Sequence, residues 1–223
     1  MTKVVTIDGP SGVGKGTISE HLANKLRWNY LNSGALYRAI AWVVKNDSIE
    51  LSNFIELENA SKNIHFTIRE KKLHIEYKNI EISSLIYNEE VAKTASKVSS
   101  IPKVRESILN IQRAFNKEPG LIAEGRDMGS VIFPEAGVKI FLTASIETRA
   151  QRRFKQLKDR TFNVSLPALI KDLDARDKRD KSRKSSPLII PEGALVIETD
   201  DLSIIQVKNI VKDKVNKTYG TNI

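Results

Sequence analysis

The fold is decided by a stretch near the start of the chain, Val4-Val5-Thr6-Ile7-Asp8-Gly9-Pro10-Ser11-Gly12-Val13-Gly14-Lys15-Gly16-Thr17. An apolar run of strand length leads into four closely spaced glycines, and apolar residues recur at helical spacing from Lys15 to Leu26. Glycines allow successive backbone N–H groups to turn inward around phosphate oxygens, and the positive end of the following helix adds to this attraction. The stretch therefore predicts a phosphate-binding loop over residues 9–17, in which Lys15 reaches the β- and γ-phosphates of a nucleotide.

This loop departs from the general pattern G-x-x-x-x-G-K-S/T in one place. Gly16 follows Lys15, so the hydroxyl that usually stands directly after the lysine comes one position later, on Thr17. A hydroxyl here is suited to lie near the magnesium ion that accompanies nucleotide phosphates. The alternative, a tight glycine turn beside a solvated lysine, is disfavoured because a strand-like run precedes the loop and a helical pattern follows it.

The rest of the chain alternates apolar runs with helical patterns. Runs of strand length occur at Leu121 to Glu124, Val138 to Leu142 and Ala194 to Glu198, and a helix from Ser203 to Asn216 closes the chain. Repeated strand–helix units predict a parallel sheet covered by helices on both faces. Between Asn63 and Ile82 apolar and polar residues alternate, which predicts three short antiparallel strands inserted beside the main sheet. Further helices are expected at about 34–45, 51–61, 88–99 and 102–116.

Positive charge is concentrated in one segment. The 223 residues carry a formal net charge of +9, and residues 149–184 alone hold 13 Lys or Arg against five Asp. A nucleic-acid surface would interleave aromatic residues for base stacking, whereas this segment has only Phe154 and Phe162. A lid that closes over the phosphates of a small anion explains the concentration better, so no nucleic-acid partner is expected.

Composition also limits the location of the protein. No cysteine occurs, which excludes disulfides and thiolate-bound zinc. The apolar run at the start is too short for a signal sequence, and no later run approaches the roughly 18 apolar residues of a membrane span. We therefore expect a cytoplasmic protein with no membrane partner.

Two further motifs place charged residues where ligands bind. Residues 32–38, Asn-Ser-Gly-Ala-Leu-Tyr-Arg, open a predicted helix that Ser33 can cap, and Arg38 stands one turn inside it, where a guanidinium can hold a phosphate. Residues 120–129 run from a buried strand into a glycine-flanked Arg-Asp pair at the carboxyl edge of the sheet, where open α/β folds bind ligands. The alternative for residues 32–38 is an ordinary capped surface helix, and the alternative for residues 120–129 is a salt-bridged turn. Two trios in the basic segment each share one helix face: Arg149, Arg152 and Arg153, and Arg176, Asp180 and Arg183.

Together these motifs resemble those of the bacterial cytidylate kinases, within the nucleoside monophosphate kinase family. The likeness extends nearly from end to end and rests on residues 7–17, 33–38, 112–115, 125–129 and 176–180. The resemblance implies an α/β P-loop kinase with a five-stranded parallel sheet flanked by helices, a small three-stranded antiparallel insert and a helical basic lid. It implies one domain over 1–223, comprising core segments 1–60, 88–148 and 185–223, an insert at 61–87 and a lid at 149–184.

The resemblance also implies transfer of the γ-phosphoryl group of ATP to CMP or dCMP with Mg²⁺, and we expect the protein to be a monomer. The implied ATP-binding residues are Gly9, Pro10, Ser11, Gly12, Val13, Gly14, Lys15, Gly16 and Thr17, with Thr17 near the magnesium. The implied catalytic residues are Lys15, Arg149, Arg153 and Arg176. The implied CMP-binding residues are Ser33, Arg38, Ser96, Arg105, Arg126, Asp127, Arg176, Asp180 and Arg183. Asn32 departs from the aspartate that the resemblance leads us to expect before Ser-Gly.

The chemistry of cytosine agrees with this set. Asp127 and Ser96 could accept the hydrogens of the cytosine amino group, while Arg105 donates to N3 and O2. The O4 of uracil would face Asp127 acceptor to acceptor, and a site of this kind can reject an analogue by up to roughly 10⁴. The phosphate would be held by Arg38, Arg126 and Arg176, and a sugar hydroxyl by Asp180.

Two other functions remain open from the sequence. One is a P-loop kinase for another small acceptor, such as UMP, AMP or a non-nucleotide metabolite. The other is a GTPase or RNA-binding regulator that uses the same loop. The second is disfavoured because no Asn-Lys-x-Asp motif occurs and no Asp is followed three residues later by Gly.

Overall fold

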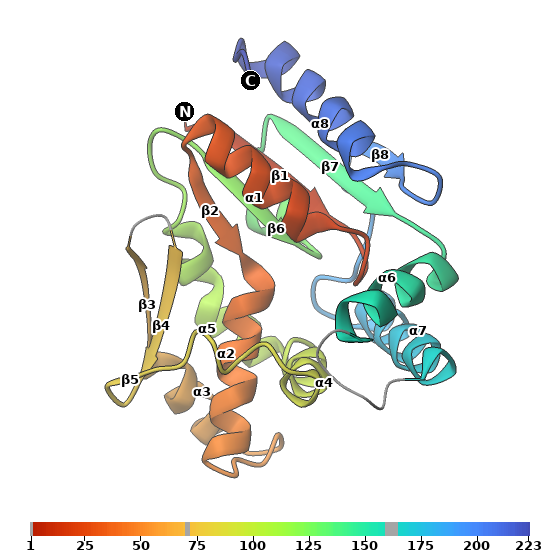
Figure 1. The fold of residues 1–223 in the computed structure, drawn as a ribbon. Helices are drawn as coiled ribbons and strands as arrows, with labels where there is room; N and C mark the ends of the chain where they lie inside the picture. The colour runs from red at the N-terminus through yellow and green to blue at the C-terminus, as the bar shows by residue number, and fades with distance from the viewer. Residues whose placement is uncertain (1, 70–71, 159–164) are drawn as a thin grey trace.

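A computed structural model describes residues 2–69, 72–158 and 165–223. Its main sheet has five parallel strands in the order β2-β6-β1-β7-β8 (Figure 1), which confirms the predicted sheet. The strands are β1 (Val4–Asp8), β2 (Asn29–Asn32), β6 (Leu121–Gly125), β7 (Val138–Thr143) and β8 (Leu195–Glu198). β2 pairs with β6 in a register that places Asn32 beside Glu124 at the carboxyl edge.

Both faces of the central strands β1 and β6 are buried, and successive residues of a strand contribute to opposite faces. Val4 and Ala123 belong to one apolar cluster, whereas Val5, Ile7 and Ile122 belong to another. The first cluster includes residues of α2 (Ser33–Asn46), α4 (Glu89–Val98) and α5 (Pro102–Arg113), and the second includes residues of α1 (Lys15–Leu26) and α8 (Ile204–Tyr219). Helices on both faces leave the carboxyl edge of the strands as the place for a ligand.

The predicted insert is a separate antiparallel sheet of β3 (Ile64–Arg69), β4 (Lys72–Tyr77) and β5 (Ile80–Glu81). The preceding helix, α3 (Phe54–Lys62), begins later than predicted because the side chain of Asn53 caps it by accepting from the backbone N–H of Glu56. Ile64, Ile75 and Tyr77 are buried in the same cluster as α2. The small sheet is thus anchored to α2 and stands beside the main sheet (Figure 1).

The basic segment forms two helices, α6 (Ile146–Lys158) and α7 (Leu166–Ser182), which pack together through Ala150, Leu169 and Leu173. In Figure 1 they lie beside α4, at the end of the sheet toward which β1 and β7 point. Residues 159–164, part of the predicted lid, lie outside the described residues. The boundaries of core, insert and lid stay predictions.

One element was not predicted, a π-helical turn η1 (Met128–Ile132) shortly after β6. Asp8, fully buried at the end of β1, accepts from the backbone N–H groups of Met128 and Gly129, both at 2.8 Å. Burial raises the pKa of Asp8 to about 6. This carboxylate therefore fixes the turn that follows Arg126 and Asp127.

Candidate active site

The phosphate-binding loop between β1 and α1 adopts a backbone conformation that requires glycine. Gly9 and Gly12 have φ angles of 144° and 84°. A Cβ on Gly9 would lie only 2.1 Å from the backbone oxygen of Leu142. In α1, all of which is described, the first turn carries no acidic residue and no side-chain cap, so its N–H groups are available to an anion.

Lys15 is folded back onto this loop. Its ammonium donates to the carbonyl oxygen of Pro10 at 2.6 Å. Burial lowers the pKa of Lys15 well below its usual value, and the nearby carboxylate of Glu124 acts in the opposite direction. Glu124 accepts from the hydroxyl of Tyr30 at 2.5 Å, and its Oε1 lies 3.4 Å from where a Cβ on Gly16 would be. Glu124 thus lies within van der Waals distance of position 16, beside the lysine.

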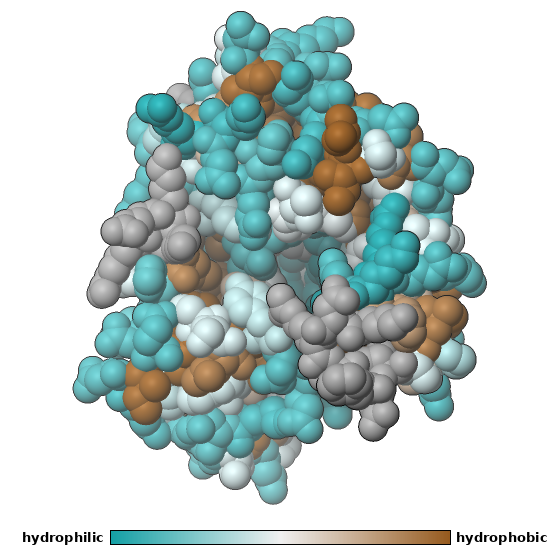
Figure 2. Space-filling model, in the orientation of Figure 1, coloured by the Kyte–Doolittle hydropathy of each residue, from teal (hydrophilic) through white to brown (hydrophobic). Residues whose placement is uncertain are grey.

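A cavity of about 510 Å³ opens beside the loop. The loop lines one side of it, and α4 and the lid helices line another. In the space-filling view a hollow among hydrophilic residues lies near the centre of this face (Figure 2). The predicted site residues that line the cavity are Ser11, Gly12, Gly14, Lys15, Gly16, Thr17, Arg38, Ser96, Arg126, Arg153 and Arg176.

The start of α2 differs from the prediction. Asn32, not Ser33, caps the helix, since its side-chain oxygen accepts from the backbone N–H of Ala35 at 3.1 Å. Ser33 is already helical, and its buried hydroxyl accepts from the side-chain amide of Gln112 at 2.8 Å. The predicted cap at Ser33 is wrong because the amide oxygen one residue earlier takes that place.

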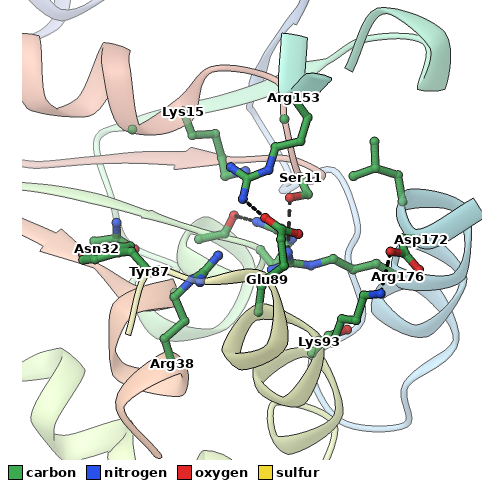
Figure 3. A pocket seen from close by; sticks show the side chains of 18 of the residues that line it. Ser11, Lys15, Asn32, Arg38, Tyr87, Glu89, Lys93, Arg153, Asp172 and Arg176 are labelled. Carbon is green, nitrogen blue, oxygen red and sulfur yellow. Dashed lines mark hydrogen bonds and ion pairs between the residues drawn. The ribbon is translucent and has the colours of Figure 1, made fainter. Parts of the chain in front are cut away.

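Arg38 projects from α2 into the cavity, as predicted (Figure 3). Its guanidinium donates to the backbone oxygens of Ile86 and Asn88 at 3.0 and 3.3 Å. It also lies over the ring of Tyr87, 5.7 Å from the centroid. The segment that precedes α4 therefore sets the direction of this arginine.

A narrow second cavity of about 40 Å³ shares Arg126 and Arg176 with the first. Asp127 lines it, is only 1% exposed and forms ion pairs with Arg105 and, at 3.7 Å, with Arg183. A buried carboxylate between two buried guanidinium groups can recognise a polar ring by hydrogen bonding. The structure thus brings together the charged residues that the resemblance implies for the base.

The remaining predicted CMP-binding residues lie around these two cavities. Arg126 donates to the carboxylate of Asp180 at 2.8 Å, and the hydroxyl of Ser96 accepts from Arg179 at 3.1 Å. Eight of the nine predicted residues line one cavity or the other: Ser33, Arg38, Ser96, Arg126, Asp127, Arg176, Asp180 and Arg183. The ninth, Arg105, is bound to Asp127.

Two lid arginines contact the phosphate-binding loop at Ser11. Arg149 donates to the backbone oxygen of Ser11 at 3.2 Å, and Arg176 donates to its hydroxyl at 3.3 Å. Arg149 is also ion-paired with Asp177 at 2.7 Å, which joins α6 to α7. Burial lowers the pKa of Arg176 to about 9. Both lid helices therefore bring a guanidinium to the loop.

The two other lid arginines of the predicted common face point to different places. Arg153 is ion-paired with Glu89 at the start of α4 (Figure 3). Arg152 instead donates to the hydroxyl of Thr199 at 2.9 Å, directly after β8. The prediction that the three arginines share one face is therefore wrong for Arg152, which contacts the end of the sheet instead of the cavity.

Several residues of the site were missed from the sequence. Glu124 ends the predicted strand at 121–124, and this position directly before Gly-Arg-Asp could have identified it as a residue of the sheet edge. Tyr87 and Glu89 both line the cavity but belong to a segment without a recognisable motif. Asp8 was quoted as part of the loop stretch, yet its role in holding η1 depends on residues far away in the sequence.

Comparison with known proteins agrees with this geometry. The family model described as cytidylate kinase matches residues 5–217. The cytidylate kinase of Colwellia psychrerythraea (strain 34H) is 48% identical over 213 residues, covering 93% of each chain, and that of Aeromonas salmonicida (strain A449) is 45% identical over 209 residues, covering 93% of this chain and 91% of the other. A solved gluconokinase from Sinorhizobium meliloti 1021 is similar in fold alone, with a TM-score of 0.50 and 10% identity over 99% of this chain and 98% of that one. This chain belongs to the cytidylate kinase family of ATP-dependent phosphotransferases.

Proposed function

We propose that the enzyme binds ATP at residues 9–17 and CMP or dCMP around Arg126, and transfers the γ-phosphoryl group directly between them to give ADP and CDP or dCDP. The observation that carries the proposal is the shared cavity, which the loop lines together with Arg38, Arg126 and Arg176. A donor and an acceptor phosphate held in one cavity can react without a covalent enzyme intermediate. Catalysis then comes from positioning and charge stabilisation.

The acceptor phosphate is assigned to Arg38, Arg126 and Arg176. They come from α2, the end of β6 and α7, so they approach one point from three elements. The Nε of Arg176 is buried and finds no hydrogen-bond partner among the described residues. Buried unpaired donors are uncommon in folded proteins, and they suit a site that receives an anionic, oxygen-rich ligand. Asp180 is assigned to a sugar hydroxyl.

The base is assigned to Asp127, Ser96 and Arg105. In this arrangement Asp127 and Ser96 accept from the cytosine amino group, and Arg105 donates to N3 and O2. Arg105 and Asp127 are 6% and 1% exposed, so a base that left either unpaired would incur the cost of a buried unsatisfied charge. Uracil would incur this cost at Asp127.

The transferring phosphoryl group is assigned to Lys15, the loop N–H groups and the lid arginines. Lys15 must leave the carbonyl oxygen of Pro10, since its ammonium is bound there. Arg149 and Arg176 are held at Ser11, beside the loop. Positive groups that are fixed before the reaction stabilise developing charge with little reorganisation.

Magnesium is proposed to bind near Thr17 and Glu124. Both residues line the cavity, and together they offer a hydroxyl and a carboxylate oxygen, the donor type that Mg²⁺ prefers. No cluster of three or more His, Cys, Asp or Glu side chains that could hold a metal occurs within residues 2–69, 72–158 and 165–223. This fits Mg²⁺, which usually takes one or two protein ligands, substrate phosphates and water. When bound, the ion would neutralise charge on the ATP phosphates.

A coupled assay of ADP release across CMP, dCMP, UMP and AMP tests the proposed acceptor. CMP and dCMP should give the highest kcat/KM, and removal of Mg²⁺ with a chelator should abolish turnover. A higher kcat/KM with AMP or UMP would refute the assignment of the base site.

We also propose that the enzyme is a monomer and acts in the cytoplasm. No helix in the described part of the chain is long and apolar enough to span a membrane. Size-exclusion chromatography with light scattering measures the mass, which should match the 25.1 kDa of one chain.

A further inference from the structure

Arg153, which is assigned to the transfer, already has a carboxylate partner. Its guanidinium is ion-paired with Glu89, and both side chains line the cavity (Figure 3). A carboxylate inside a cavity for two nucleotides repels their phosphates. Glu89 therefore has a function other than attracting the substrates.

The position of Glu89 allows the pair to form and to separate. Glu89 is the first residue of α4, directly after the N-cap Asn88, so the helix dipole stabilises its charge even without a partner. The side chains of Arg153 and Glu89 are 33% and 42% exposed. An ion pair this exposed contributes at most about a fivefold change in an equilibrium constant. An acceptor phosphate, which carries more charge than a carboxylate, can displace it.

Arg38 lies close enough to respond to both members of the pair. Burial lowers the pKa of Arg38, the charge of Arg153 lowers it further, and the charge of Glu89 raises it. A phosphate bound at Arg38 would therefore act on the pair in two ways. It would repel Glu89 and attract Arg153.

We propose that Glu89 is a positioning residue that withholds Arg153 from the γ-phosphoryl group of ATP until an acceptor phosphate enters the cavity. The inference rests on the proposed role of Arg153 in the transfer. The suppressed side reaction is attack of water on the γ-phosphorus, in which the bond to the bridging oxygen breaks and ATP and water give ADP, inorganic phosphate and a proton. Glu89 thus favours transfer to CMP over transfer to water.

A second ion pair between α4 and the lid provides a control for simple lid closure. Lys93 on α4 is paired with Asp172 on α7 at 2.8 Å, and both also line the cavity (Figure 3). Loss of this pair loosens the lid but leaves Arg153 bound to Glu89. Variants of the two ion pairs therefore distinguish the release of Arg153 from the opening of the lid.

The test compares ATP hydrolysis without acceptor with CMP phosphorylation in the full-length enzyme. Glu89→Gln keeps the size of the side chain and removes its charge, so hydrolysis should rise about two- to fivefold, and its ratio to the CMP kinase rate should rise as well. Glu90→Gln is the matched control, because Glu90 is 81% exposed and pairs with Lys45; both rates should stay at the wild-type values. Asp172→Asn should not raise hydrolysis.

A double variant tests whether Arg153 carries the effect. Glu89→Gln combined with Arg153→Met should return hydrolysis to the wild-type rate or below. Three results would overturn the inference: no rise in Glu89→Gln, an equal rise in Asp172→Asn, or a rise that persists without Arg153. Failure of the wild-type enzyme to phosphorylate CMP would instead refute the proposed function, and the acceptor panel reports that separately.

Discussion

Replacement of Asp127 by Asn should reduce the preference for cytosine over uracil. The carboxylate is 1% exposed and is paired with Arg105 and Arg183. Asn has nearly the same size, but its amide nitrogen is a donor that can meet the O4 of uracil. A hydrogen bond to a charged group contributes about 1.5–3 kcal/mol, which corresponds to a factor of about 10 to 150. The ratio of kcat/KM for CMP to that for UMP should fall by this factor.

The assay is coupled ADP release with each acceptor below its KM. Asp177→Asn is the matched control, because Asp177 pairs with Arg149 on the lid, and loss of its charge should slow both acceptors equally. Removal of one partner from a buried ion pair can destabilise a protein by about 3–5 kcal/mol, so thermal unfolding of each variant is recorded and rates are compared where both are folded. An unchanged ratio in Asp127→Asn, or an equal fall in Asp177→Asn, would refute the assignment of Asp127 to the base.

Three further changes test other parts of the molecule. Lys15→Ala should lower kcat by about 10² to 10³ because it removes a charge from the transferring phosphoryl group, and near-normal turnover in the coupled assay would contradict this. Tyr87→Leu should raise the KM for CMP about two- to fivefold by removing the ring under Arg38, whereas Tyr87→Phe keeps the ring and should not; equal KM values would show that the ring has no role. The pKa of Asp8 rises on folding from 3.8 to about 6 because its carboxyl group is buried. The protonated carboxyl group therefore adds about 3 kcal/mol to the free energy of unfolding below about pH 4, and this contribution is lost as the pH rises through 6. Urea unfolding at several pH values should show this fall in the wild type and not in Asp8→Asn, and parallel curves would contradict it.

Much of the fold could be predicted because its elements have strong local patterns. β1 is buried along its whole length, and the loop after it has four glycines within eight residues, a spacing that occurs nowhere else in the sequence. The turn η1 could not be predicted, because it depends on hydrogen bonds that Asp8 accepts from backbone N–H groups about 120 positions away. The cap of α2 was misplaced because Asn32 and Ser33 are both good capping residues, and only the backbone geometry distinguishes them.

The sequence predicts which residues belong to the candidate site, but it does not predict which of them form ion pairs with one another. The carboxyl edge of a parallel sheet and the spacing within α7 indicate which residues gather, and eight of the nine predicted acceptor residues do line the cavities. Which carboxylate each arginine binds depends on contacts between distant elements. Arg153 with Glu89 and Arg126 with Asp180 are 64 and 54 residues apart, respectively. No local pattern reports such contacts.

These ion pairs neutralise part of the positive charge that the sequence places around the site. Four arginines in and around the two cavities are bound to carboxylates: Arg105 to Asp127, Arg126 to Asp180, Arg149 to Asp177 and Arg153 to Glu89. A nucleotide that binds one of these four arginines must therefore replace its carboxylate, and the released carboxylate needs a new partner if it is buried. In the proposed arrangement CMP satisfies both members of one such pair, since its phosphate meets Arg126 while a sugar hydroxyl donates to Asp180. A free phosphate would take Arg126 from Asp180 and leave this carboxylate only its longer ion pair with Arg183, at 3.9 Å, so the pairing itself favours a complete nucleotide over a simple anion of the same charge.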